Sequence, residues 1–166
     1  MHYPITLVDV AVILMAAACF RSTVADVQAT TRKLWRLSLP PLLGIAASLL
    51  MLASAVVSFE HDATWVATAL VGAVGGVLRG RQIAVETDQM WGTVRMPVVY
   101  DTVIAAFCIL AIASVDVLSG VFKPGVFPRH AYMAAASALF AGYLAGRAWS
   151  LMRRAMRLPH TELGMH

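Results

Sequence analysis

Residues 39–59 read LPPLLGIAASLLMLASAVVSF, a run without a charged side chain. A helix needs about 20 mostly apolar residues to cross the hydrocarbon core of a bilayer. Pro40 and Pro41 suit the first turn of a helix, where the missing N–H of proline is no loss. This stretch therefore predicts a membrane-spanning helix and makes an integral membrane protein the first hypothesis for the chain.

Four further apolar stretches have comparable composition. They cover residues 5–20, 63–78, 98–118 and 131–151. The whole chain agrees, because 60% of its 166 residues are hydrophobic and only 13% are charged, whereas about a quarter of a soluble domain is charged. The predicted fold is an all-α polytopic bundle of five transmembrane helices. It forms one domain over residues 1–158, followed by a short tail over residues 159–166.

The basic residues are unequally divided between the two sides of this arrangement. One side holds Arg21, Arg32, Lys33, Arg36, Arg79, Arg81, Arg95, Arg147, Arg153, Arg154 and Arg157, and the other holds only Lys123 and Arg129. The positive-inside rule places the N-terminus outside and the C-terminus in the cytoplasm. The predicted location is the bacterial inner membrane. Since membrane orientation accounts for the basic character, nucleic acid is excluded as a partner.

The loop between the third and fourth helices has a strand-like pattern. Over residues 82–96, Ile83 and Val85 alternate with polar residues, as do Val94 and Met96 beyond a glycine-containing turn. This alternation around a turn predicts a short cytoplasmic β-hairpin. Trp91 lies at its tip and is predicted to dock a partner protein, with membrane anchoring as the alternative. The preceding cytoplasmic loop, residues 21–38, is predicted as an amphipathic interfacial helix or a plain orientation signal.

Small residues recur every four positions in the third and fifth predicted helices. The third carries Gly72, Gly76 and Gly80, and the fifth carries Ala138, Gly142 and Gly146. Such spacing keeps the small residues on one face, where two helix backbones can approach closely. Both helices run in the same direction across the membrane. The seams therefore predict either packing between these helices or contact between copies of the chain.

Histidines and acids near the outer ends of the helices form a candidate metal site. The candidate ligands are His61, His130, Asp62 and Asp116. Carboxylates and neutral imidazoles bind divalent cations, although this spacing matches no metal motif. The two histidines are also the only pair on one side that a b-type haem would use as axial ligands. Ordinary solvated interface residues are the alternative, and the sequence identifies no cofactor.

Three acids in or near the same region are candidates for an ion or proton pathway. They are Asp9, Asp116 and Glu60. A charged group within a membrane span is costly and indicates function by default. Glu60 belongs, with the two residues that follow it, to a short outer turn between the second and third predicted helices.

Other polar residues have simpler explanations. Asp101 begins the fourth helix, where an acid favours the helix dipole. Arg147 lies near the inner end of the fifth helix and is predicted to extend its side chain to the headgroups. Cys19 and Cys108 lie at different depths and are predicted to be separate thiols.

The layout resembles that of the CcdC-like bacterial membrane proteins. The residues that carry the resemblance are Arg79-Gly80-Arg81, which close the third helix, and Gly92-Thr93-Val94-Arg95, which precede the fourth. The likeness extends over most of the chain but includes no diagnostic motif. It implies a five-helix protein linked to cytochrome c biogenesis, and it carries over no catalytic residue.

The sequence leaves three classes of function open. The first is a non-catalytic accessory or assembly protein that packs with itself or with a membrane-protein partner. The second is a small homo-oligomeric transporter or channel for a cation or small solute, using the outer acids. The third is a membrane redox or metal-binding protein. P-loop, HExxH, GxSxG and GxGxxG motifs are absent from the sequence, so an enzyme is the less favoured expectation.

Overall fold

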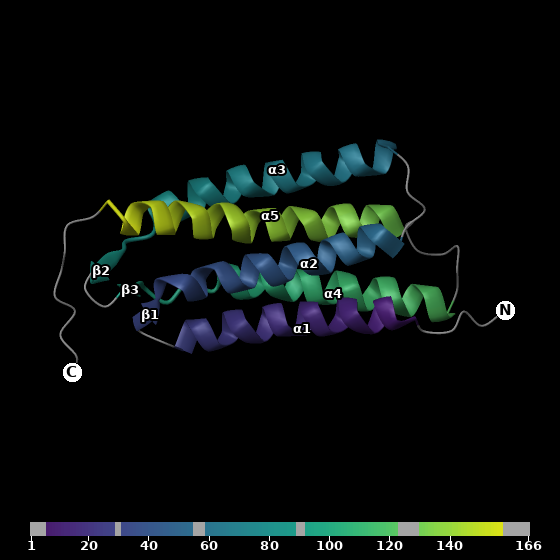
Figure 1. Cartoon of the computed structure of the whole chain (residues 1–166), viewed down its shortest axis with the longest axis horizontal. Coiled ribbons are helices and arrows are strands. Elements are labelled where there is room, and N and C mark those ends of the chain that lie inside the picture. The colour runs from purple at the N-terminus through teal and green to yellow at the C-terminus, as the bar shows by residue number, and fades with distance from the viewer. Residues whose placement is uncertain (1–5, 29–30, 55–58, 89–91, 123–129, 158–166) are drawn as a thin grey trace.

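The computed structural model describes residues 6–28, 31–54, 59–88, 92–122 and 130–157. Within them, long helices lie side by side along one axis, and a small sheet lies at one end, here called the sheet end (Figure 1). The helices are α1 (Leu7–Gln28), α2 (Leu39–Ser54), α3 (Phe59–Gln82), α4 (Asp101–Phe122) and α5 (His130–Ala155), with a short 3-10 helix, η1 (Leu34–Ser38), before α2.

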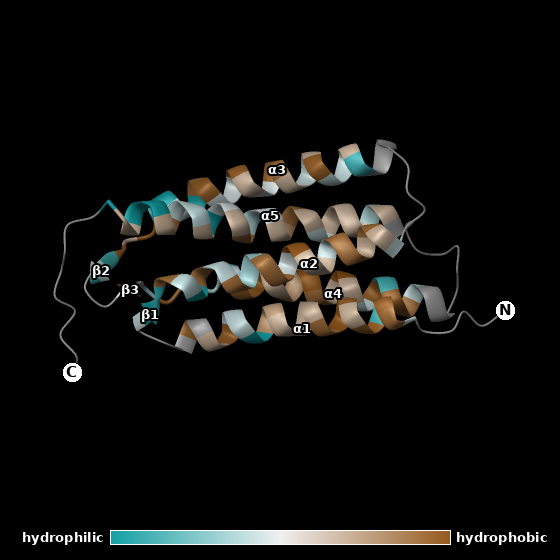
Figure 2. Cartoon of the chain, in the orientation of Figure 1, coloured by the Kyte–Doolittle hydropathy of each residue, from teal (hydrophilic) through white to brown (hydrophobic). Residues whose placement is uncertain are grey.

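Four of these helices are long and apolar enough to cross a membrane. The candidate spans are Leu7–Ala25, Leu34–Ser54, Asp62–Gln82 and Asp101–Ser119. Large apolar side chains such as Leu14, Leu42, Leu70 and Phe107 are exposed on the bundle surface. Apolar residues also dominate the helices along much of their length (Figure 2). An apolar exterior suits contact with lipid, so the chain is a membrane protein with at least these four candidate spans.

Helix α5 is long enough to span a bilayer but is not among the four candidates. It packs against α2, α3 and α4, and its buried residues are mostly small, as at Ala134, Ala138 and Ala141. Small residues and arginine lower its hydropathy. A helix enclosed by other helices presents little surface to lipid, so its sequence is selected for close packing more than for apolar bulk.

The main core lies between α1, α2, α4 and α5. Val12, Met51, Ile109 and Leu144 are among its buried residues. On its α1–α4 side, the rings of Phe20 and Phe107 lie 6.0 Å apart at a tilt of 59°. Helix α3 packs mainly on α5, on the side away from α1 and α4 (Figure 1). Much of α3 therefore faces outward.

The sheet has three antiparallel strands in the order β1-β3-β2. They are β1 (Thr31–Lys33), β2 (Glu86–Asp88) and β3 (Thr93–Arg95). The predicted hairpin is present as β2 and β3, with Thr87 opposite Val94. Gly92 ends its turn with φ of +59°, a left-handed conformation that glycine adopts without steric cost.

The prediction of an interfacial helix over residues 21–38 is wrong. Helix α1 does not end at residue 20 but continues to Gln28, and the chain then forms β1 and η1. Strand β1 pairs with β3, Arg32 lying opposite Val94. The Leu34 backbone N–H also donates to the Gly92 carbonyl at 2.9 Å. Partners distant in sequence therefore satisfy the backbone groups that a local helix would have satisfied.

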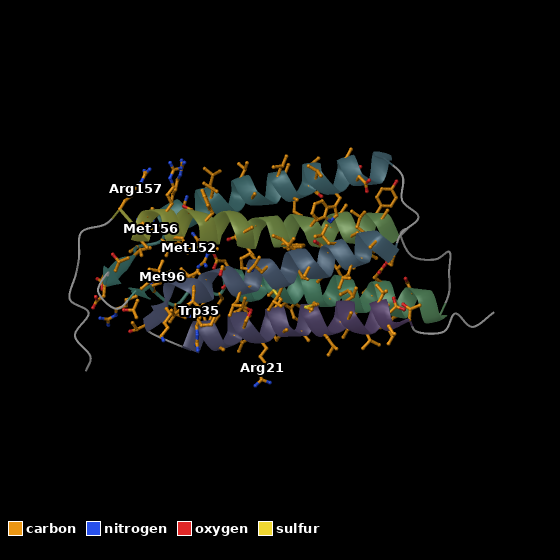
Figure 3. All side chains as sticks on the ribbon, in the orientation of Figure 1. Arg21, Trp35, Met96, Met152, Met156 and Arg157 are labelled. Atoms are coloured by element: carbon orange, nitrogen blue, oxygen red, sulfur yellow. The ribbon has the colours of Figure 1, made fainter. Side chains whose placement is uncertain are left out.

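A second, smaller core attaches the sheet to the bundle. Its buried members are Leu37, Ile83, Val94, Met96, Leu151 and Ala155. Figure 3 labels Met96 and Met152 at the sheet end. Beside this core, the Arg154 guanidinium donates to the carbonyls of Gly80, Arg81 and Ile83 at 3.0, 3.0 and 2.7 Å. These bonds satisfy carbonyls at and just beyond the end of α3, which would otherwise lack partners.

The boundary between the second and third helices also differs from prediction. Glu60, His61 and Asp62 lie in the first turn of α3, not in a separate outer turn. Acids are favoured there because the N-terminal end of a helix carries partial positive charge. The helix dipole therefore accounts for Asp62 at this position.

Candidate functional site at the sheet end

A charged cluster joins three helices near the sheet end. Asp101, the first residue of α4, accepts three hydrogen bonds at Oδ2. The donors are the Tyr143 hydroxyl at 2.9 Å, Arg147 Nε at 3.1 Å and Arg79 Nε at 3.4 Å. Tyr143 and Arg147 come from α5 and Arg79 from α3. We call these four residues the Asp101 cluster.

The other oxygen of Asp101 serves the helix itself. Oδ1 accepts a hydrogen bond from the Thr102 backbone N–H at 2.9 Å. The predicted role of Asp101 at the start of α4 therefore describes only one of its two oxygens. The second oxygen, Oδ2, accepts hydrogen bonds from side chains of two other helices, α3 and α5.

Burial is graded across the cluster. The side chain of Arg147 is 7% exposed, that of Asp101 17% and that of Arg79 45%. Arg147 therefore does not extend to the headgroups as predicted, but lies inside the bundle. A buried charge is tolerated when a partner of opposite charge and further hydrogen bonds compensate its lost hydration. Asp101 supplies that compensation.

Arg147 also borders a small cavity on the side of α1 and α2. Thr23, Arg32 and Thr102 are among the other residues that line it. Its volume is about 20 Å³, which is enough for a single water molecule. Two guanidinium groups and two hydroxyls make the lining polar. Arg147 therefore contacts Asp101 on one side and borders this polar cavity on the other.

An apolar groove begins beside the Asp101 cluster. It has a volume of about 420 Å³ and runs between α3 and α4, with α5 forming its floor. Val71 and Ile104 contribute apolar walls and Leu139 an apolar floor, whereas Asp101 and Tyr143 contribute polar atoms. This arrangement suits an amphipathic molecule with an apolar chain and one polar group.

The small-residue seams of α3 and α5 face each other within the chain. A Cβ atom added at Gly72 would lie 1.9 Å from the Leu139 carbonyl oxygen, and one at Gly76 would lie 2.0 Å from that of Tyr143. From the opposite side, a Cβ at Gly142 or Gly146 would lie 2.1 or 2.0 Å from a carbonyl oxygen of α3. The backbones are therefore too close for side chains at these positions.

The remaining seam residues fit the same contact. Ala138 is fully buried in α5, and a Cβ at Gly80 would lie 2.8 Å from the Ser150 Cβ. Of the two interpretations of the seams, packing between α3 and α5 is the one seen here. Contact between copies of the chain stays a prediction.

The predicted metal ligands are only partly described. The side chains of Glu60, His61 and His130 lie outside the described residues. Asp62 is half-buried near the start of α3, and Asp116 is buried in α4. Within the described residues, no group of three or more His, Cys, Asp or Glu side chains is placed to hold a metal. The haem hypothesis rests on His61 and His130, whose side chains lie outside the described residues, so it stays a prediction.

Asp9 has a structural role at the start of α1. Its Oδ2 accepts from the backbone N–H and the hydroxyl of Thr6, both at 2.8 Å, and its own N–H donates to the Thr6 hydroxyl at 3.3 Å. This reciprocal pair is a capping box, which satisfies backbone donors at a helix N-terminus. The capping box accounts for an acid at this position without an ion pathway.

Two further predictions concern Trp91 and the cysteines. Trp91 lies outside the described residues. Cys19 and Cys108 are both free thiols, as predicted. The Cys19 thiol lies 3.2 Å from the Pro40 carbonyl oxygen, which accepts its hydrogen bond, and thereby links α1 to the start of α2.

The Asp101 cluster was missed at the level of sequence. Its members are up to 68 residues apart, from Arg79 to Arg147. The sequence explains Asp101 by the helix dipole and the two arginines by membrane orientation, and it singles out nothing at Tyr143. The available signal was Arg147 itself, a cation within a run of alanine, glycine and leucine. A charge in such a run favours a buried partner over an exposed one.

Comparison of the chain with protein-family models, with curated proteins and with solved structures finds no match. The resemblance to CcdC-like proteins therefore stays a prediction. A function for the chain has to be inferred from its own fold, charges and cavities.

Proposed function

We propose that the chain is a non-catalytic accessory protein of the bacterial inner membrane, and that its sheet binds a partner protein at the cytoplasmic surface. In this proposal α5 is the fifth transmembrane helix, the N-terminus is outside and the sheet end is cytoplasmic. The distribution of basic residues supports that orientation. The length of α5, 26 residues, is sufficient for a span.

The observation that carries the proposal is the attachment of the sheet. The strands come from two different connections between helices, and a buried apolar core holds them against η1 and the end of α5. An isolated two-stranded hairpin is marginal by itself, and a third strand or packing against a helix is needed to stabilise it. The attachment makes the sheet a fixed platform.

The order of the strands leaves β1 and β2 at the two edges of that platform. An edge strand offers unpaired backbone N–H and C=O groups to another chain. Thr31 on β1 and Glu86 on β2 are exposed, but Thr87 and Asp88 of β2 are buried, so β1 is the more open of the two edges. A partner that adds a strand, or that covers the sheet, would contact one of them.

Site-specific photo-crosslinking in intact membranes tests this. A photoreactive residue replaces Thr31 or Glu86, and Leu70, exposed on the outer face of α3, serves as the matched control. We expect a protein adduct of one defined mass from at least one edge position and none from Leu70. Trp91→Ala should reduce the yield of this adduct. Absence of an adduct from both edges, or an equal yield from Leu70, would refute the proposal.

The groove favours a second candidate, which is binding of a membrane amphiphile for storage or transport. Its apolar walls and the polar atoms of Asp101 and Tyr143 are the specific observation. Gly75→Leu should fill the groove, whereas Val74→Leu on the exposed face of α3 should not. Mass spectrometry of the purified variants should find the co-purifying amphiphile reduced only in Gly75→Leu. Equal retention in both variants would exclude the groove as its site.

A further inference from the structure

We infer that four arginines at the sheet end form a binding site for the phosphate of an anionic phospholipid. This site is independent of the partner-binding edges and lies on the other side of α3 from the amphiphile groove. Its arginines are Arg81 of α3, Arg153 and Arg154 of α5, and Arg157 just after α5. We call it the arginine pocket.

The arginine pocket is an open hollow at the surface between α3 and α5. Its volume is about 260 Å³, several times the ~30 Å³ that a water molecule occupies in the liquid. Val77, Trp149 and Ser150 complete the lining. The lining includes no acidic residue among those described. Four like charges around one hollow would repel each other unless an anion lay between them.

Three of the four cations are available to a ligand. Arg154 is held by three backbone carbonyls at the end of α3, so its position is fixed but its charge is not neutralised. Arg81, Arg153 and Arg157 are exposed, and in the described part of the chain none of them is paired with a carboxylate. Guanidinium groups match phosphate oxygens in geometry and charge, often through two hydrogen bonds at once.

The surroundings favour a lipid over a free phosphate ion. Trp149 is 62% exposed beside the arginines, and tryptophan is enriched at membrane–water interfaces. Apolar Val74 and Leu78 are exposed further along α3. A phospholipid can place its phosphate among the arginines while its acyl chains follow this apolar face. Basic pockets between transmembrane helices on the cytoplasmic side commonly bind anionic headgroups.

The structure supplies a matched control. Arg21 projects from α1 on the opposite side of the bundle from Arg157 (Figure 3). Arg36 lies over the ring of Trp35, 5.8 Å from its centroid. Neither residue lines the arginine pocket. The double variant Arg21→Gln/Arg36→Gln therefore removes the same charge as Arg81→Gln/Arg153→Gln without altering the pocket.

The experiment measures lipid binding to the full chain in detergent by native mass spectrometry and by thermal shift. The probes are phosphatidylglycerol, phosphatidylcholine and inorganic phosphate. We expect phosphatidylglycerol to bind the wild type more tightly than phosphatidylcholine does. We also expect Arg81→Gln/Arg153→Gln to weaken phosphatidylglycerol binding about 30-fold, from two cations near an anionic surface. Because both residues are exposed, this variant should keep the fold, as circular dichroism would show.

Three results would overturn the inference. Equal loss of binding in the control variant would show that net charge alone attracts the lipid. Phosphatidylcholine also carries a phosphate, but its choline cation cancels the charge, so equal binding of this lipid would show that the pocket does not select a net negative headgroup. Full stabilisation by inorganic phosphate alone would assign the pocket to a soluble anion. Arg157→Gln is a second variant in case the double variant fails to fold, and it should weaken phosphatidylglycerol binding about fivefold.

Discussion

Replacement of Asp101 by alanine should destabilise the protein strongly, because it leaves the buried Arg147 without its carboxylate. Three donors from two other helices converge on Asp101 Oδ2. Alanine removes that acceptor while the guanidinium of Arg147, with 7% of its side chain exposed, stays in place. The perturbation therefore isolates one unpaired buried charge.

The magnitude follows from the graded burial of the three donors. Breaking a buried ion pair by removing one partner costs about 3–5 kcal/mol. The lower end applies here, since Asp101 is itself 17% exposed. Arg79 is 45% exposed, so its pair with Asp101 contributes at most about 1 kcal/mol. Arg147→Met should cost less than Asp101→Ala, because Asp101 then keeps Tyr143 and Arg79.

The assay is reversible thermal unfolding of the purified protein in a mild detergent. A loss of about 3 kcal/mol corresponds to a fall in Tm of about 6–12 °C for a chain of this size. The double variant Asp101→Ala/Arg147→Met should recover most of that loss, because neither charge is then left unpaired. If the Tm of the double variant falls by the sum of the single effects, the cluster does not act as a buried pair and the reasoning is refuted.

Three further predictions concern the backbone. Gly76→Ala should destabilise the protein by about 2–3 kcal/mol through overpacking of the α3–α5 contact. A Cβ at Gly75 would lie 4.0 Å from its nearest neighbour, so Gly75→Ala should be neutral or stabilising by up to about 1 kcal/mol. Thermal unfolding of the two variants tests this difference. Gly92→Ala should cost about 1–2 kcal/mol at its positive φ, with less loss for Gly92→Asn, and faster amide exchange in β3 would report the weakened hairpin. Thr6→Ala should remove the cap of α1 at a cost of about 1 kcal/mol, and Thr6→Ser should restore it; an unchanged Tm for Thr6→Ala would mean that the capping box adds nothing.

The apolar segments could be located from sequence because lipid imposes a simple local requirement. Each of α1–α4 has to be long and apolar over its own length, and residues 34–54 meet this condition without reference to any other part of the chain. The boundaries were less accurate. Helix α1 continues eight residues beyond its predicted end, and α3 begins four residues before its predicted start, because polar residues can extend a helix past the apolar core.

The α3–α5 contact was foreseeable in part. The repeat of Gly72 and Gly76 against Gly142 and Gly146 indicates a face where backbones approach, and spacing alone reveals that face. Spacing does not reveal whether the partner helix belongs to the same chain. That choice depends on how the connections between helices position them, which is a property of the whole bundle.

Local sequence is enough to show that this chain is built of apolar helices, that its polar segments lie between them, and that α3 and α5 each have a small-residue face. These features arise from the composition and periodicity of single segments. The assembled fold is needed to show that β1 joins the hairpin, that Arg147 turns inward to Asp101, and that Arg81 and Arg157 border one pocket. Each of these depends on residues far apart in the chain meeting at one place, where a charge or an unpaired backbone group needs a partner that no local pattern specifies.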